Sequence, residues 1–250
     1  MTDVTLSIVP ASMNEMKSIE TLFVRLIPIL KNLKIPFEVI CVNDGSTDNT
    51  YFALLQQQRN LPEIVIVDLS RNFGKEAALT AGIEAASGEA LIPLDADLQD
   101  PPELIPEMIE QWQNGAEVVL AIRTVRQTDS YFTRKSAGIF YWILNRVSEI
   151  DIPAHSGDFR LMNRQVIDTF LSLPERARFN KGLFAWLGFK TSVINFERPL
   201  RVSGSSNWSF KSLWSLAIDG ITSFSSLPLR IWSYLGIIIA LIAIGYGISV

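Results

Sequence analysis

The first half of the chain alternates short apolar runs with amphipathic stretches, and this alternation restricts the fold more than any other feature. The strand-like runs are residues 5–9, 37–42, 64–69, 90–94 and 118–122. The predicted helices between them are residues 18–33, 47–58, 75–86 and 102–114. Repeated strand–helix units favour a mostly parallel sheet with helices on both faces. The sequence therefore predicts an α/β fold.

The second half is less regular. A charged loop over residues 123–135 interrupts the alternation. Further predicted elements are a helix at 136–147, a strand at 159–162, a helix at 164–173 and a strand at 191–196. Within residues 206–230, apolar side chains recur every three or four positions, which is a helical period. Such amphipathic helices fit two places equally well, against the core or in the plane of a membrane interface.

The last 20 residues, 231–250, contain no charged side chain. About 20 apolar residues are needed to cross a bilayer, and Trp232 and Tyr234 lie where interfacial aromatic residues belong. We therefore predict a transmembrane helix over 231–250, with a buried core helix as the alternative. Arg230 and Lys211 precede it, so the positive-inside rule predicts a cytoplasmic location for the domain before it. Because the apolar run reaches the end of the sequence, we expect a longer natural protein with a further membrane helix.

Composition excludes some partners. The net charge is −4 and the pI is about 5.2, so the chain has no overall basic field that would attract nucleic acid. Any anionic ligand must be bound by a local cluster of arginines. The only cysteine, Cys41, lies in an apolar strand pattern and is expected to be a buried, inert thiol.

Two carboxylates, Asp95 and Asp97, directly follow the strand predicted at 90–94. Ligands of α/β sheets gather beyond the carboxyl ends of the strands, and carboxylate oxygens suit Mg²⁺ or Mn²⁺. The alternative is a solvated acidic turn. A second acidic turn at 42–48 follows another predicted strand, and this repetition favours a metal-assisted site over a chance pair.

Four sequence motifs, each after a predicted strand, resemble glycosyltransferase family 2. They are IVPASMNE at 8–15, VNDGSTD at 42–48, RNFGK at 71–75 and DADLQDPP at 95–102. Within this family the chain is similar to the polyprenyl-phosphate sugar transferases, the group of dolichyl-phosphate mannose synthase and the bacterial undecaprenyl-phosphate glucosyltransferases. The resemblance covers nearly all 250 residues in order. It implies a GT-A-type fold.

The resemblance also implies a set of donor-side residues. Asp97 would be the main ligand of Mg²⁺ or Mn²⁺, with Asp95 beside it. The segment 201–208 resembles one that closes over the diphosphate, although Asn207 stands where lysine is common. For Lys75, a solvated helix start is as good a reading as a donor contact. The residues implied to bind the nucleotide are Pro10, Ala11, Glu15, Asp44, Lys75, Asp95 and Arg201.

On the acceptor side, residues 156–164 resemble a motif in which Asp158 matches the position of the catalytic base. A phosphate monoester has a second pKa near 6 and is already anionic at neutral pH. We therefore expect Asp158 to orient the acceptor more than to deprotonate it. The residues expected to bind the acceptor phosphate are Arg123, Arg126, Arg134 and Ser136. A solvated basic loop is the alternative for this cluster.

Together these expectations describe an inverting, metal-dependent transfer of glucose from UDP-glucose to a polyprenyl phosphate at the cytoplasmic face of the inner membrane. The alternatives are a GDP-mannose-dependent mannosyltransferase and a non-catalytic nucleotide-sugar-binding membrane module. Residues 1–205 would form the catalytic domain, 206–230 juxtamembrane helices and 231–250 the membrane segment. The expected partners are a nucleotide sugar, the lipid acceptor and the membrane, and a homo-oligomer is left open.

Overall fold

The computed structural model describes residues 4–96, 99–124, 156–174, 180–196 and 227–249. The chain divides into two compact units. One consists of Met1–Asp129 and Pro153–Ser206, and the other of Ser130–Ile152 and Asn207–Val250. The first unit holds the sheet and most of the described helices.

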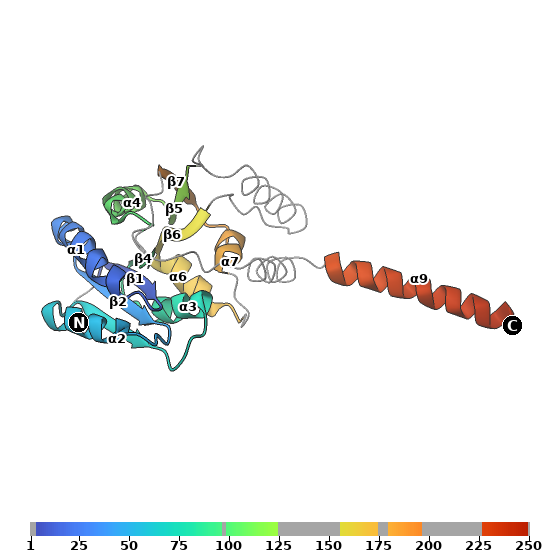
Figure 1. Cartoon of the computed structure of the whole chain (residues 1–250). Helices are drawn as coiled ribbons and strands as arrows, with labels where there is room; N and C mark the ends of the chain where they lie inside the picture. The colour runs from blue at the N-terminus through green and yellow to red at the C-terminus, as the bar shows by residue number, and fades with distance from the viewer. Residues whose placement is uncertain (1–3, 97–98, 125–155, 175–179, 197–226, 250) are drawn as a thin grey trace. The chain divides into compact units, whose positions relative to one another are not determined.

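Seven strands form one mixed sheet in the order β3-β2-β1-β4-β6-β5-β7 (Figure 1). All neighbours pair in parallel except β6, which runs antiparallel to both β4 and β5. The strands are β1 (Leu6–Ser12), β2 (Phe37–Asn43), β3 (Ile64–Asp68), β4 (Ala90–Asp95), β5 (Val118–Arg123), β6 (Ser156–Asn163) and β7 (Thr191–Phe196). The prediction of a mostly parallel sheet is confirmed.

The helices of the first unit also follow the predicted order. They are α1 (Met16–Leu33), α2 (Thr50–Asn60), α3 (Lys75–Ala85), a short 3-10 turn η1 (Pro102–Leu104) that leads into α4 (Ile105–Gln113), α6 (Arg164–Ser172) and α7 (Asn180–Trp186). Helix α7 is an addition to the predicted elements. The helix predicted at 136–147 lies outside the described residues, as does 206–226 of the amphipathic region.

The central strands are buried on both faces, as expected for a sheet covered by helices on each side. Leu6 and Ile8 of β1 belong to the main apolar core together with Leu22 of α1. Val9, the residue after Ile8, points to the opposite face, against α3. There Gly82 of α3 packs so closely that a Cβ atom on it would collide with the Val9 side chain.

The antiparallel direction of β6 brings its two ends to opposite edges of the sheet. Its last residue, Asn163, pairs with Ala90 at the amino end of β4, and its first residue, Ser156, pairs with Ile122 near the carboxyl end of β5. Asp158, near the start of β6, is therefore brought to the edge where the parallel strands end. Arg164, which directly follows β6, is brought to the edge where they begin.

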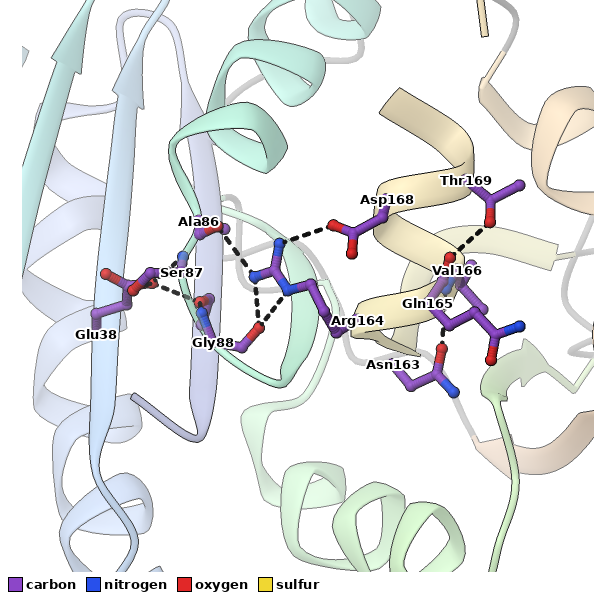
Figure 2. Close-up of polar contacts among 11 residues, drawn as sticks. Glu38, Ala86, Ser87, Gly88, Asn163, Arg164, Gln165, Val166, Asp168 and Thr169 are labelled. Carbon is purple, nitrogen blue, oxygen red and sulfur yellow. Dashed lines mark hydrogen bonds and ion pairs between the residues drawn. The ribbon is translucent and has the colours of Figure 1, made fainter. Parts of the chain in front are cut away.

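At that amino edge, a polar cluster in which Ser7 and Glu38 are buried joins β1, β2, the turn before β4 and α6. The Glu38 carboxylate accepts hydrogen bonds from Ser7 Oγ at 2.6 Å, Ser87 N at 2.7 Å and Ser87 Oγ at 3.0 Å. Figure 2 shows Arg164 reaching from the start of α6 to the same turn. Its guanidinium donates to the carbonyl oxygens of Ala86 and Gly88, each at 3.0 Å.

The second unit contributes helix α9 (Leu227–Ser249) to the described residues. Among the described helices, none is both long enough and apolar enough to cross a membrane. The transmembrane segment predicted over 231–250 is therefore not confirmed.

Candidate functional site

The loops that follow β1 and β2 are locked together at the carboxyl edge of the sheet. Asn14 N donates to Ser46 Oγ at 3.0 Å, and Thr47 N donates back to Asn14 Oδ1 at 2.9 Å. Asn14 has a φ of 56°, in the left-handed region that asparagine tolerates better than most residues. These contacts set the position of the two loops that carry the first two sequence motifs.

Three predicted nucleoside-pocket residues lie on or directly after β1. Pro10 and Ala11 are aligned with Leu94 and Asp95 of the neighbouring strand β4, so they share an edge with the predicted metal side. Glu15 caps the start of α1, and its carboxylate accepts a hydrogen bond from Ser18 Oγ at 2.7 Å. The structure thus brings Pro10 and Ala11 beside Asp95, while Glu15 also supports the first turn of its own helix.

Asp44, the fourth predicted pocket residue, is buried and holds the loop between β3 and α3. Its two carboxylate oxygens accept backbone hydrogen bonds from Phe73 N at 2.8 Å and Gly74 N at 3.0 Å. The neighbouring Gly45 has a φ of +61°, and a Cβ atom on it would overlap the backbone of Arg71. Asp44 and Gly45 together therefore determine where the chain enters α3.

Lys75, the first residue of α3, lies between two of the predicted site carboxylates. Its Nζ atom is 2.7 Å from Asp95 Oδ1, 2.8 Å from Asp95 Oδ2 and 2.8 Å from Asp158 Oδ2. Burial alone would lower the pKa of Lys75, but the attraction of Asp95 and Asp158 outweighs burial and raises the pKa above its usual value. The donor-side and acceptor-side carboxylates therefore share one ammonium group.

A third carboxylate, Asp100, lies next to this group and is only 1% exposed. Burial, reinforced by the negative charge of Asp95, raises the pKa of Asp100 to about 6, against the opposing effects of Arg123 and Lys75. Arg123, at the end of β5, pairs with it: its terminal nitrogen is 3.2 Å from Asp100 Oδ1. The Arg123 guanidinium also lies against Gly157, where an added Cβ would be 3.2 Å from it.

Behind Asp158, the buried Arg160 lies over the ring of Phe184 of α7, 4.7 Å from its centroid, and donates to the Gly157 carbonyl. Asn180, the first residue of α7, donates its backbone N–H to Glu76 Oε2 at 3.0 Å. The start of α3 is thus tied to α7 and held close to β6.

Sequence reasoning assigned no role to four of these residues: Glu76, Asp100, Arg160 and Asn180. Asp100 had a readable signal, since it is a third carboxylate in the run that contains Asp95 and Asp97. Glu76 and Asn180 had none, because α7 was not predicted. Arg160 lies in the motif at 156–164, but its partner Phe184 belongs to α7. The predicted site residues that lie outside the described part of the chain are Asp97, Arg126, Arg134, Ser136 and Arg201.

Of the two predicted metal ligands, Asp95 and Asp97, the structure describes Asp95. Among the described residues, no group of three or more His, Cys, Asp or Glu side chains could hold a metal ion. Asp95 nevertheless suits a divalent cation: its side chain is 26% exposed, its oxygens are hard ligands, and a cation, the Lys75 ammonium, already lies against both of them. The described donor set is thus compatible with Mg²⁺ or Mn²⁺ binding at Asp95.

Residues 7–171 match the family described as glycosyl transferase family 2. Over 244 residues the chain is 49% identical to an uncharacterized glycosyltransferase of Synechocystis, covering 98% of this chain and 77% of that protein. It is 45% identical to the bactoprenol glucosyl transferase of Shigella phage SfV, covering 97% of this chain and 79% of that protein.

In fold, the chain resembles glucosyl-3-phosphoglycerate synthase from Mycobacterium tuberculosis, an enzyme crystallised with Mn²⁺, UDP-glucose and glycerol 3-phosphate. The TM-score is 0.57 at 18% identity, covering 86% of this chain and 76% of that one. This likeness confirms the predicted GT-A-type fold. With the family match over residues 7–171 and the high identity over nearly the whole sequence, the chain belongs to glycosyl transferase family 2 and is a glycosyltransferase.

Proposed function

We propose that this glycosyltransferase moves glucose from UDP-glucose to a polyprenyl phosphate at the cytoplasmic face of the inner membrane. The observation that carries the proposal is the meeting of Asp95, Lys75 and Asp158 at one edge of the sheet. It occurs in a chain that is 45% identical to a bactoprenol glucosyl transferase over 97% of its length. Asp95 is the donor-side carboxylate and Asp158 the acceptor-side carboxylate of this site. The substrate class is proposed from the name of the relative.

On the donor side, Pro10 and Ala11 border the nucleoside at the end of β1, with Asp44, Glu15 and Arg201 as further contacts. Asp95, together with Asp97, would hold Mg²⁺ or Mn²⁺. When bound, such an ion neutralises the diphosphate as it departs. Asp95 is well placed for this role because it ends β4, next to Ala11 of β1.

On the acceptor side, Arg123 binds the phosphate of the lipid, since a planar guanidinium can contact two phosphate oxygens at once. Asp100 holds Arg123 in place through the 3.2 Å ion pair. We assign the same phosphate-binding role to Arg126, Arg134 and Ser136. Asp158 orients the acceptor, because a phosphate with a second pKa near 6 needs little deprotonation at neutral pH.

The transfer is a single displacement with inversion. An oxygen of the acceptor phosphate forms a bond to C1 of glucose while the bond between C1 and the UDP oxygen breaks. The two electrons of the broken bond leave with UDP, and no proton needs to move. Residues 206–250 would keep the domain at the headgroup level of the membrane, where the lipid phosphate lies. Such positioning lowers the entropic part of the barrier.

The test uses the full chain, undecaprenyl phosphate, Mg²⁺ or Mn²⁺, and a panel of nucleotide sugars that includes UDP-glucose and GDP-mannose. We expect the lipid to gain the mass of one hexose from UDP-glucose, and chelation of the metal to abolish the gain. Asp95→Asn should lower the rate more than about 100-fold, since it removes a contact to the charge that develops on the leaving group. Its thermal unfolding curve is the control for folding.

Other results would overturn the proposal in distinct ways. A lipid product formed only from GDP-mannose would make the chain a mannosyltransferase. Binding of UDP-glucose without any lipid product would favour a non-catalytic module. Full activity of Asp95→Asn would exclude the metal-assisted mechanism. The anomeric configuration of the lipid-linked glucose, read by NMR, tests inversion separately.

A further inference from the structure

Lys75 is held in place from both sides along the chain. Before it, Asp44 accepts the backbone N–H groups of Phe73 and Gly74. After it, the Glu76 carboxylate accepts the backbone N–H of Asn180 at 3.0 Å, and the Glu76 carbonyl accepts from the Asn180 side chain at 3.2 Å. A lysine at a solvated helix start needs no such contacts. These hydrogen bonds fix the backbone of Lys75 on both sides.

The ammonium of Lys75 takes up the oxygens that a metal ion would use. It contacts both oxygens of Asp95, at 2.7 Å and 2.8 Å, and one oxygen of Asp158 at 2.8 Å. Mg²⁺ binds carboxylate oxygens directly, at about 2.0–2.1 Å. A divalent ion at Asp95 would compete with the ammonium for the lone pairs of the same two oxygens, and the like charges of the ion and the ammonium repel. The side chain of Lys75 is 44% exposed, so solvent can reach it when its contact with Asp95 is lost.

We propose that Lys75 is an internal counter-ion that a divalent cation must displace from Asp95, after which the ammonium stays with Asp158. Binding of the metal at Asp95 is thereby coupled to the ion pair between Lys75 and Asp158. In the absence of metal and nucleotide, one ammonium draws Asp95 and Asp158 together. When a metal binds Asp95, the positive charge of Lys75 is still balanced by the carboxylate of Asp158. The assignment of these two sides rests on the proposed function, but the competition for Asp95 is a property of the chain itself.

The test measures Mn²⁺ binding without any nucleotide, from the electron paramagnetic resonance signal of free Mn²⁺. Lys75→Met removes the ammonium and keeps a side chain of similar length. We expect it to bind Mn²⁺ about fivefold or more tightly than the native chain, because an ion pair worth about 1 kcal/mol no longer competes. Lys75→Arg keeps a cation and should leave the affinity near the native value.

Lys31→Met is the matched control. It removes the same charge from the exposed last turn of α1, which lies at the amino edge of the sheet. We expect no more than a small change in its Mn²⁺ affinity, which separates local competition from the general field of the protein. Circular dichroism and thermal unfolding of each variant establish that it is folded.

The proposal is overturned if folded Lys75→Met binds Mn²⁺ no more tightly than the native chain, or if Lys31→Met gains as much affinity as Lys75→Met. Failure of the proposed function gives a different result. In that case the native chain transfers no sugar to lipid, while Lys75→Met still gains Mn²⁺ affinity. Conversely, normal transfer by the native chain without that gain refutes the counter-ion and leaves the function intact.

Discussion

The two edges of the sheet use polar residues in opposite ways. At the amino edge, Glu38 accepts three hydrogen bonds and Arg164 donates to two backbone carbonyl groups (Figure 2). At the carboxyl edge, some buried polar atoms lack a hydrogen-bond partner among the described residues. They include Asp100 Oδ2 and Arg123 Nε. A buried polar atom without a partner costs about 1–3 kcal/mol.

The difference separates structural from functional polar groups. In the Glu38 cluster, a single carboxylate oxygen, Oε1, accepts three hydrogen bonds from the protein itself. Arg123 Nε lacks an acceptor at the edge where the proposed acceptor phosphate would lie, so a phosphate oxygen could satisfy a donor that the fold does not. Substitutions at the amino edge should therefore reduce stability, and those at the carboxyl edge should mainly reduce transfer.

The largest expected effect on stability is that of Glu38→Ala. It leaves Ser7 Oγ and the Ser87 N–H without their acceptor, and we expect a loss of about 2–4 kcal/mol in the free energy of unfolding, measured in urea. The folded fraction should transfer glucose at the native rate, because the cluster lies at the edge opposite Asp95.

Glu20→Ala is the control for this substitution. It removes a carboxylate from an exposed position of α1 and should change stability by less than about 0.5 kcal/mol. If Glu38→Ala lowered the rate of the folded protein as much as Asp95→Asn does, the proposed separation of the two edges would be wrong.

Two glycines, one at each edge of the sheet, test the same comparison with a smaller expected effect on the free energy of unfolding. Gly45→Ala would force a Cβ against the Arg71 backbone at a φ of +61°, and Gly88→Ala would place one 2.6 Å from Ser7 Oγ. Both should lose about 1–3 kcal/mol in stability. Only Gly45→Ala should also raise the KM for the sugar nucleotide, by about tenfold, because it displaces the loop that leads to Lys75.

Gly115→Ala provides the reference for these two glycine variants. Gly115 has a φ of +94°, and an added Cβ would meet no atom within 4 Å. This variant therefore carries the conformational cost alone, about 1 kcal/mol. An unchanged KM in Gly45→Ala would show that the loop does not position the donor site.

The sequence predicted the parallel part of the fold well, because short continuous apolar runs, typical of strands buried on both faces, alternate regularly with longer stretches of mixed polarity. The first five strands were found within three residues of their observed ends. The strand at 159–162 was predicted, but its antiparallel direction was not. Strand direction depends on which neighbour a strand pairs with, and this partner is remote in the sequence.

The candidate site was predicted in part for the same reason. Asp95 and Asp44 follow parallel strands, so their shared edge could be read from the motif positions. The contact between Lys75 and Asp158 could not, since it depends on the reversed direction of β6. The support of Glu76 by Asn180 depends on α7, whose seven residues are too few for a clear helical period.

The last expected effect concerns the pH dependence of stability. The pKa of Asp100 is about 6 in the folded chain against an ordinary value of 3.8. Between these pH values the folded state keeps a proton that the unfolded state has lost. The contribution of Asp100 to stability is therefore fully present below about pH 3.8 and is lost as the pH rises through 6. Asp100→Asn has no such titration.

Relative to Asp100→Asn, the native chain should therefore lose at least about 1 kcal/mol of unfolding free energy between pH 4 and pH 6.5. Urea unfolding of both proteins across this range measures the difference, in which contributions from unaltered groups largely cancel. Glu110→Gln removes an exposed carboxylate from α4 and is the matched control for the loss of one charge. A constant difference between the native chain and Asp100→Asn would mean that Arg123 and Lys75 keep Asp100 ionised. The Asp100–Arg123 pair would then be a fixed ion pair, comparable to the hydrogen-bonded groups of the amino edge, and the contrast between the two edges would rest on Lys75 alone.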